Sequence, residues 1–314
     1  MAETSSIEWT DATWNPITGC SVVSPGCTNC YAMKLAGTRL KHHRSRAGLT
    51  VESKAGPVWN GQVRLNAEWL DQPLRWRRAR RIFVCAHGDL FHEDVPDAWI
   101  DQVFGVMALA PQHTFQVLTK RAVRMRAYME GLDDAADARA RRVGMLRREA
   151  RPLPNVWLGV SAESQAWADQ RIPHLLKTPA ALRFLSAEPL LQPLDLEPYL
   201  NPVRAWSNRW LNAYPLAYPA HRLDWVIAGG ESGADARPMN PVWARQLRDQ
   251  CAAAGVAYFF KQWGAWGPVE VEDLQNGDWF HNFGEGQVVL HVGKKAAGRR
   301  LDGVTHDAMP VAHA

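Results

Sequence analysis

Short apolar runs recur along the chain and alternate with amphipathic stretches, which is the pattern of strands and helices that follow one another. Each run is nearly continuous in β-branched or aromatic residues, as in strands buried on both faces of a parallel sheet. The runs are Arg81–Ala86, Thr114–Thr119, Asn155–Val160, Leu182–Ser186, Asp224–Ala228 and Ala257–Lys261, with a shorter first strand near Thr13–Thr18. The pattern therefore predicts about seven strands.

The amphipathic stretches between these runs predict helices over Pro96–Ala110, Ala122–Glu130, Ala166–Lys177 and Pro241–Ala254. The first and last begin with proline at an N1-like position, and Asn240 is a plausible N-cap. Repeated βα units build either an open doubly wound sheet or a full or partial TIM-type barrel. The doubly wound alternative would carry G-x-G-x-x-G after its first strand, and the sequence has none. We expect an α/β fold with parallel strands in a full or partial (βα) barrel.

Polar residues follow the carboxyl end of nearly every predicted strand. In order along the chain they are Asp89 and His92, Thr119 to Arg121, Ser161 and Glu163, Ser186 and Glu188, Gly229 to Ser232, and Lys261 with Gln262. A barrel brings such positions to one mouth, where the chemistry of these folds takes place. The same positions are therefore the candidate site.

Three stretches interrupt the alternation. Residues 41–80 are polar and basic and are expected to form an insertion after the first helix, and residues 131–153 predict a charged, solvated helix. The tail alternates glycine with short strand-like pieces such as QVVLHV, which predicts a small β appendage. We accordingly expect a barrel over residues 1–264 and an appendage over residues 265–314.

Composition excludes several classes of protein. Of 314 residues, 46% are hydrophobic, 22% are charged and 15 are Trp, which is enough apolar surface to rule out disorder as the dominant state. No apolar run reaches membrane-spanning length, and the first residues lack the basic flank and apolar core of a secretion signal. We expect a cytoplasmic protein with no membrane partner.

The five cysteines are unevenly placed, and their odd number argues against a disulfide framework in such a protein. Cys85 and Cys251 stand in apolar surroundings and are expected to be buried and inert. Cys20, Cys27 and Cys30 share one loop, where three thiolates can hold three irons of a cubane cluster and leave the fourth open. They can also supply three ligands of a tetrahedral zinc, with His42 or His43 as the fourth. The position of the loop, after the first strand, favours the cluster.

A three-cysteine loop after the first strand of a (βα) barrel resembles the radical S-adenosylmethionine superfamily. The segments WNPITGC, GCTNCYA, GDLFHEDVP, FQVLTKR, NVWLGVSAES, RFLSAEPLL, VIAGGESG and FFKQWG together resemble a phage and bacterial family with a three-Cys motif and a domain of unknown function (Gp37/Gp68-like). This resemblance covers most of the chain, from Trp9 to Trp266.

The superfamily resemblance implies a [4Fe–4S] cluster on the three cysteines and S-adenosylmethionine on its open iron. An electron from a donor such as a flavodoxin or ferredoxin would cleave the sulfonium and give a 5′-deoxyadenosyl radical, which takes hydrogen from a substrate. Asp89 is then the candidate for the cofactor's ammonium, Ser161 and Glu163 for its ribose, and Glu188 for a further contact. The Gly-Gly-Glu stretch lies on a late strand here, so that role is not carried over to Glu231.

The sequence departs from the superfamily pattern at two points. Six residues separate Cys20 from Cys27 where three are usual, a difference that a loop bulging around Pro25 and Gly26 can absorb. Asn29 stands where an aromatic residue usually precedes the last cysteine, and Tyr31 is the candidate to replace its contact with the adenine.

Basic runs suggest a nucleic acid or nucleotide as substrate. They lie at Lys41–Arg46, Trp76–Arg81, Ala138–Arg142 and Lys294–Arg300, and Trp59, Trp69 and Trp76 are interleaved with the first two. The competing interpretation is that these arginines are only solvated. A zinc-stabilised nucleic-acid-binding module without catalysis is the main alternative function. A metal-free hydrolase using Glu163 and Glu188 would leave the cysteine loop unexplained.

Overall fold

A computed structural model describes residues 5–131, 152–201 and 221–311 of the chain. Its main sheet has seven parallel strands in the order β1-β6-β7-β8-β9-β10-β11, so the strands of this sheet lie side by side in the order in which they occur along the chain. The strands are β1 Ala12–Trp14, β6 Arg81–Val84, β7 Thr114–Thr119, β8 Val156–Ser161, β9 Leu182–Ala187, β10 Trp225–Gly229 and β11 Ala257–Gln262. The α/β fold is confirmed, and the strand order agrees with a partial (βα) barrel.

Burial explains why these segments are strands. Every residue of β8, β9 and β10 is buried, as the continuous apolar runs predict for a parallel sheet. The predicted first strand is wrong in one respect, because Thr13–Thr18 divides into β1 and a separate β2, Ile17–Thr18. Pro16 lies between them, and proline supplies no N–H for a ladder and restricts the residue before it. β2 pairs antiparallel with β5, Arg64–Leu65, outside the main sheet.

The helices follow the predicted ones closely. They are α1 Tyr31–Gly37, α2 Asp97–Leu109, α3 Ala122–Gly131, α5 Gln165–Lys177, α6 Glu197–Leu200, α8 Pro241–Ala254 and α9 Lys294–Ala297. Asn240 caps α8 as predicted, with its Oδ1 accepting a hydrogen bond from the Val242 amide at 2.9 Å. Pro96 is the N-cap of α2 and not its first helical residue, since its ψ of 144° is extended.

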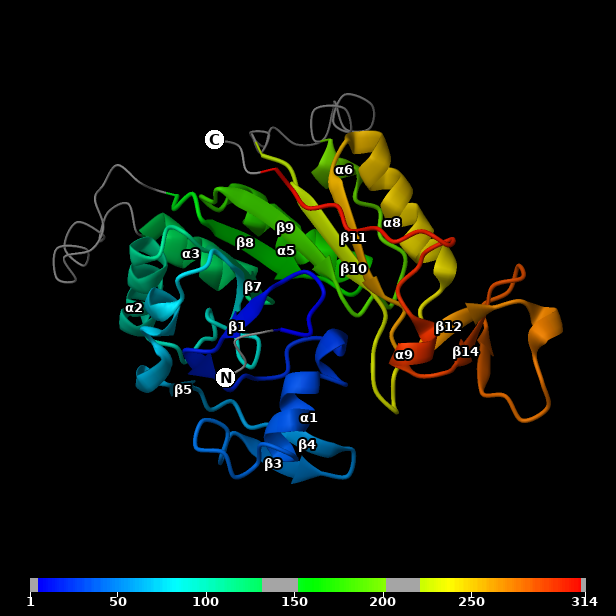
Figure 1. The fold of residues 1–314 in the computed structure, drawn as a ribbon, viewed down its shortest axis with the longest axis horizontal. Coiled ribbons are helices and arrows are strands. Elements are labelled where there is room, and N and C mark those ends of the chain that lie inside the picture. Colours follow the sequence, from blue (N-terminus) through cyan, green and yellow to red (C-terminus); the bar gives the residue numbers. More distant parts are fainter. Residues whose placement is uncertain (1–4, 132–151, 202–220, 312–314) are drawn as a thin grey trace. The chain divides into compact units, whose positions relative to one another are not determined.

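The chain divides into two compact units, which are described separately. The first runs to Val160 and includes Lys177–Arg183, and the second comprises Ser161–Leu176 and Phe184–Val311. In the first, the hairpin of β3, Thr50–Ser53, and β4, Gly56–Trp59, lies against α1 (Figure 1). The same unit contains three short 3-10 helices, η1 Pro25–Cys27, η2 Ala67–Trp69 and η3 Gln72–Arg75.

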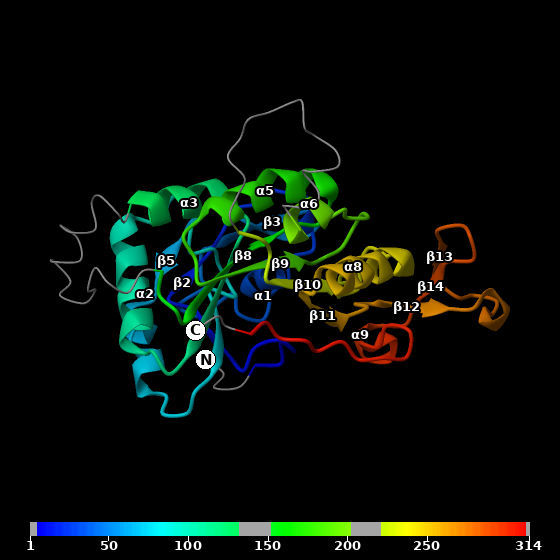
Figure 2. The ribbon, with the colours of Figure 1, turned by 90° about the horizontal axis from the view of Figure 1, so that it is seen from above.

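The second unit places α8 beside β10 and β11 (Figure 2). Its tail contains the predicted small β structure, an antiparallel sheet of β12 Trp266–Val269, β14 Val288–His291 and β13 Phe280–Asn282, with η4 Val271–Asp273 between β12 and β13. The chain then returns to the main sheet, because the Phe260 amide donates to the His306 carbonyl at 2.9 Å and Trp225 Nε1 donates to the Ala308 carbonyl at 3.0 Å.

The charged helix predicted over residues 131–153 and the basic run Ala138–Arg142 fall outside the described residues, except for 131, 152 and 153. Within the described residues, no helix has both the length and the apolar character that crossing a bilayer requires.

Candidate functional site

The cysteine loop begins at a glycine that no other residue can replace without a shift of the backbone. Gly19 has a φ of +95°, and a Cβ there would lie 2.1 Å from the carbonyl oxygen of Gln62. Its amide donates to the His87 carbonyl at 3.2 Å, which ties the loop to the segment after β6. Cys20 follows directly, Cys27 ends η1, and Cys30 is the N-cap residue of α1. The loop is thus anchored at both ends.

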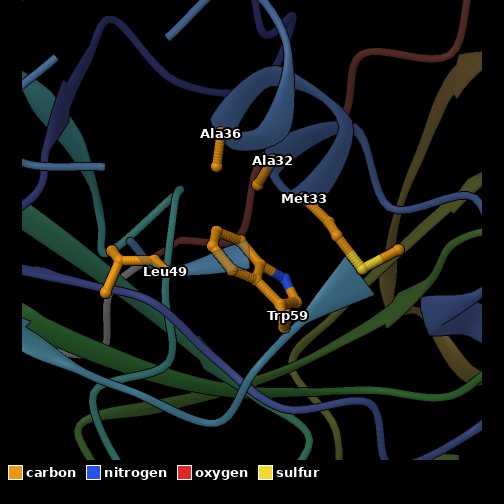
Figure 3. Close-up of a cluster of buried hydrophobic side chains, with 5 residues drawn as sticks. All are labelled: Ala32, Met33, Ala36, Leu49 and Trp59. Carbon is orange, nitrogen blue, oxygen red and sulfur yellow. The ribbon is translucent and has the colours of Figure 1, made fainter. Parts of the chain in front are cut away.

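Helix α1 is fixed by a small hydrophobic cluster (Figure 3). Its members are Ala32, Met33 and Ala36 of α1 with Leu49 and Trp59. Cys20 and Cys30 pack against the edge of this cluster. The hairpin formed within residues 41–80 therefore supports the helix that carries the last cysteine, although its role as a basic insertion stays a prediction.

All three thiols are partly buried, and burial is the main reason that the pKa of Cys20 is raised to about 12. Asp89 raises the pKa of Cys20 further and Arg121 opposes it, and the charges of Cys30 and Cys27 also act on it. Burial likewise raises the pKa of Cys30, against the backbone amides of Met33 and Ala32 and the charge of Lys120. The charges of neighbouring cysteines therefore act on both thiols, and Arg121 and Lys120 offset part of the effect of burial.

No three His, Cys, Asp or Glu side chains in residues 5–131, 152–201 and 221–311 are grouped as a preformed metal site. His43 uses its Nδ1 in a 2.7 Å hydrogen bond with Ser45 Oγ, and its ring lies 6.0 Å from that of Trp69. Zinc binding with His42 or His43 as the fourth ligand stays a prediction.

Asp89, the predicted ammonium contact, is buried and accepts four hydrogen bonds from its own unit. Oδ1 accepts from the Phe91 amide at 3.0 Å and from Thr119 Oγ1 at 2.7 Å. Oδ2 accepts from the Lys120 amide at 3.2 Å and from Arg121 Nη1 at 3.0 Å. Two carboxylate oxygens have about four acceptor positions in all, so this carboxylate is filled internally.

Arg121 connects Asp89 to the cysteine loop. The same Nη1 lies 3.5 Å from Cys20 Sγ, Nη2 donates to Ser21 Oγ at 2.7 Å, and Nε donates to Glu93 at 2.8 Å. Burial alone would lower the pKa of Arg121, but Asp89, Cys20 and Glu93 outweigh burial and raise it. This side chain therefore stays a fixed positive charge beside the first cysteine.

His92 extends the same network and is neutral. Its Nδ1 accepts a hydrogen bond from the Asp94 amide at 3.1 Å, so its proton is on Nε2, which lies 3.0 Å from Ser21 Oγ. Burial, followed by the charge of Arg121, lowers the pKa of His92. The neutral imidazole can hold Ser21 without adding charge near the cysteines.

Tyr31, the predicted adenine contact, is half exposed, with 50% of its surface accessible. Its hydroxyl donates to the Ala86 carbonyl at 2.7 Å, and its ring meets that of His87 edge to face at 5.8 Å. The hydroxyl fixes the ring at the carboxyl end of β6, and part of the ring remains open to a ligand.

In the second unit the predicted carboxylates take part in ion pairs. Glu163 lies 3.3 Å from Arg171, and both side chains are nearly inaccessible, at 1% and 3%. Arg171 also donates to the Ser161 carbonyl at 2.7 Å, and Ser161 Oγ donates to the Glu188 carbonyl at 3.2 Å. Glu188 pairs with Lys261 at 3.0 Å and is 13% accessible. Of Glu163 and Glu188, Glu188 is therefore the carboxylate that a ligand can reach.

The strand-end residues Ser186, Glu231 and Gln262 also have partners in this unit. Ser186 Oγ donates to Glu188 at 3.2 Å, Glu231 binds Arg237 through both carboxylate oxygens, and Gln262 donates to Ser232 at 2.8 Å. The sequence places these polar groups at strand ends. It does not indicate that Arg121 pairs with Glu93, Glu163 with Arg171 and Glu231 with Arg237. Arg121 was visible as a strand-end residue, yet nothing in the pattern indicated its contact with Cys20.

Some side chains of the predicted basic runs are already paired. Lys41 pairs with Glu52, Arg44 with Glu68 and Arg81 with Asp11, all at 3.1 Å or less. Of the interleaved aromatics, Trp59 and Trp76 are buried, at 7% and 6% accessible. These two rings serve as packing side chains and not as exposed stacking platforms.

Comparison with known proteins places the chain in a family. The model of a family described as "Protein of unknown function (DUF5131)" matches residues 4–310. Searches of the curated proteins and of the solved structures found no match.

Proposed function

The chain belongs to the DUF5131 family, and we propose its function from the residues described above. We propose that it is a radical S-adenosylmethionine enzyme that holds a [4Fe–4S] cluster on Cys20, Cys27 and Cys30. When bound, the cluster would supply the electron that cleaves S-adenosylmethionine to a 5′-deoxyadenosyl radical. A flavodoxin or ferredoxin is the class of partner that would deliver this electron.

The observation that carries the proposal is the environment of the thiols. Metal ligation needs thiolates, and burial makes thiolates costly unless positive groups lie nearby. Arg121 is fixed against Cys20, and Lys120 and the first amides of α1 act on Cys30. The donor set fits a thiolate-bound group with three protein ligands. A closed zinc site would need a fourth protein ligand beside the three cysteines, whereas a cluster with one open iron needs none.

Asp89 and His92 have positioning roles in this proposal. Asp89 holds Arg121 through Oδ2, and His92 holds Ser21, which in turn accepts from Arg121. We propose that Asp89 acts through Arg121 on the cysteine loop and does not contact the cofactor's ammonium, because its acceptor positions are filled.

The other predicted contacts with S-adenosylmethionine also remain proposals. Tyr31 offers a partly open ring for the adenine, and Glu188 is accessible enough to accept from an ammonium or a hydroxyl group. Ser161 and Glu163 are buried and held by internal hydrogen bonds. We propose that these two shape the strand end that presents Glu188.

A nucleic acid or nucleotide substrate is proposed from the basic composition of residues 41–46, 76–81 and 294–300. Lys41, Arg44 and Arg81 of these runs already have carboxylate partners, so the remaining basic side chains would make the phosphate contacts. Binding should fall steeply with salt if several phosphates are contacted, since counterions are released. Titration of labelled single- and double-stranded oligonucleotides at two salt concentrations tests this part, and affinity weaker than about 10⁻⁴ M at low salt would contradict it.

The catalytic proposal is tested by reconstituting the protein anaerobically with iron and sulfide, adding S-adenosylmethionine and dithionite, and measuring 5′-deoxyadenosine. The wild type and Cys251→Ala should form it, because Cys251 is buried in α8 of the other unit. Cys30→Ala should form none. Equal product from Cys30→Ala, or none from the wild type, would contradict the proposal.

A further inference from the structure

Arg46 is a buried charge with no carboxylate partner among the described residues. Only 4% of the residue is accessible, its guanidinium donates from Nη1 to Ser45 Oγ at 2.5 Å, and its Cζ lies 6.0 Å from the centre of the Trp69 ring. Its Nε is buried and has no partner, and no carboxylate acts on its charge among the described residues. A buried guanidinium in this condition costs free energy, because desolvation is not offset by an ion pair.

The basic residues near Arg46 differ from it in their partners. Lys41 and Arg44 in the same run have carboxylate partners on the surface. Arg64, whose charge acts on Arg46, donates to the carbonyls of Arg44 and Ala47 at 2.6 and 2.8 Å, and no acidic side chain in the described part of the chain pairs with it. Two arginines thus bring positive charge to one place, and no carboxylate in residues 5–131, 152–201 and 221–311 pairs with either of them.

A second buried polar atom lies near Arg46. Nδ1 of His87, in the segment that follows β6, is buried and has no hydrogen-bond partner among the described residues. Burial, with the charge of Arg46, lowers the pKa of His87 to about 4, so the ring is neutral and has a single N–H, on Nδ1 or on Nε2. In the tautomer protonated at Nδ1, this atom can donate to an anion.

We propose that Arg46, with Arg64 and His87 beside it, is a binding site for a phosphate group of a ligand at the carboxyl end of β6. A guanidinium suits phosphate because its N–H groups form a fork that matches two oxygens. The inference deepens the proposed function, on which it rests for a nucleotide as the carrier of the phosphate. It does not depend on the cluster.

Binding of AMP and of adenosine by isothermal titration isolates the contribution of the phosphate. The full chain is used as purified and again after reconstitution, in chloride buffer of constant ionic strength. The wild type should bind AMP more tightly than adenosine by about tenfold or more. Arg46→Met should lose this difference and bind both alike. Arg126→Ala, whose guanidinium pairs with Glu130 on the surface of α3, should keep it.

Two further measurements distinguish loss of the phosphate site from loss of the fold. Arg46→Met should unfold at a urea concentration equal to or above that of the wild type, since an unpaired buried charge is removed. Arg46→Lys keeps the charge without the fork and should bind AMP more weakly than the wild type. Equal affinity of the wild type for AMP and adenosine, or an unchanged preference in Arg46→Met, would overturn the site. Loss of 5′-deoxyadenosine formation with intact AMP preference would overturn only the proposed reaction.

Discussion

Arg121 is the residue on which the arrangement around the cysteine loop depends. One guanidinium contacts Asp89, Glu93, Ser21 and Cys20, and it comes from the turn just after β7. The ion pair with Asp89 is buried, with side-chain exposures of 4% and 7%. Such a pair is costly to break on one side, because the remaining charge is left without compensation.

Arg121→Met should therefore lower the free energy of unfolding by roughly 3–5 kcal/mol, the range for one partner removed from a buried pair. Urea denaturation followed by circular dichroism measures it. Arg126→Met is the matched control, because Arg126 pairs with Glu130 on the surface of α3 and its loss should change the free energy by less than about 0.5 kcal/mol. Equal effects of the two substitutions would contradict the assigned role of Arg121.

His87 should make stability depend on pH. Its pKa is lowered to about 4 in the folded protein, first by burial and then by Arg46, whereas an unfolded histidine titrates near 6.5. The unfolded chain therefore takes up the proton first as pH falls. The contribution of His87 is full above about pH 6.5, and about 3 kcal/mol of it is lost between pH 6.5 and 4.

Replacing His87 by Gln removes this titration. The loss of unfolding free energy between pH 7 and pH 4.5 should be smaller in His87→Gln than in the wild type, because the contribution of His87 is gone. His92 and His113, whose pKa values are also lowered by burial, contribute equally in both proteins. An identical loss in the two proteins would show that His87 is not buried as described.

At the scale of elements, the sequence predicts the helices and strands but not the contacts that hold them in place. β7 and α8 have the predicted bounds, because a continuous apolar run and a capped amphipathic helix are local patterns. The β3–β4 hairpin lies in residues that are mostly exposed or half-buried, so no alternation marked it. Its docking on α1 depends on contacts distant in sequence.

Gly37 tests that docking. A Cβ on Gly37 would lie 2.0 Å from Pro57 Cβ of the hairpin, so Gly37→Ala must push α1 and β4 apart. The variant should be destabilised even though alanine favours helix by about 1 kcal/mol. Gly131→Ala, at the end of α3 with nothing within 4 Å of the added Cβ, should be neutral or stabilising. Thermal unfolding of both variants measures this, and an unaffected Gly37→Ala would contradict the packing of α1.

At the scale of the whole molecule, the order of the parallel strands was predictable and the candidate site only in part. Alternating βα units dictate the strand order, and the positions after each strand could be read from the sequence. The partners of those residues could not be read, since Arg171 is eight residues from Glu163 and Lys261 lies far along the chain from Glu188. Charge pairing depends on distances that only the folded chain defines.

The central claim is that three cysteines bind one iron–sulfur cluster, and iron content after anaerobic reconstitution tests it most directly. The wild type should be brown and contain about four irons per chain, the number in a cubane cluster. Cys27→Ala should lose the iron and the colour, while Cys251→Ala should keep both. A colourless wild type that binds zinc, or a Cys27→Ala protein with its full iron, would contradict the account.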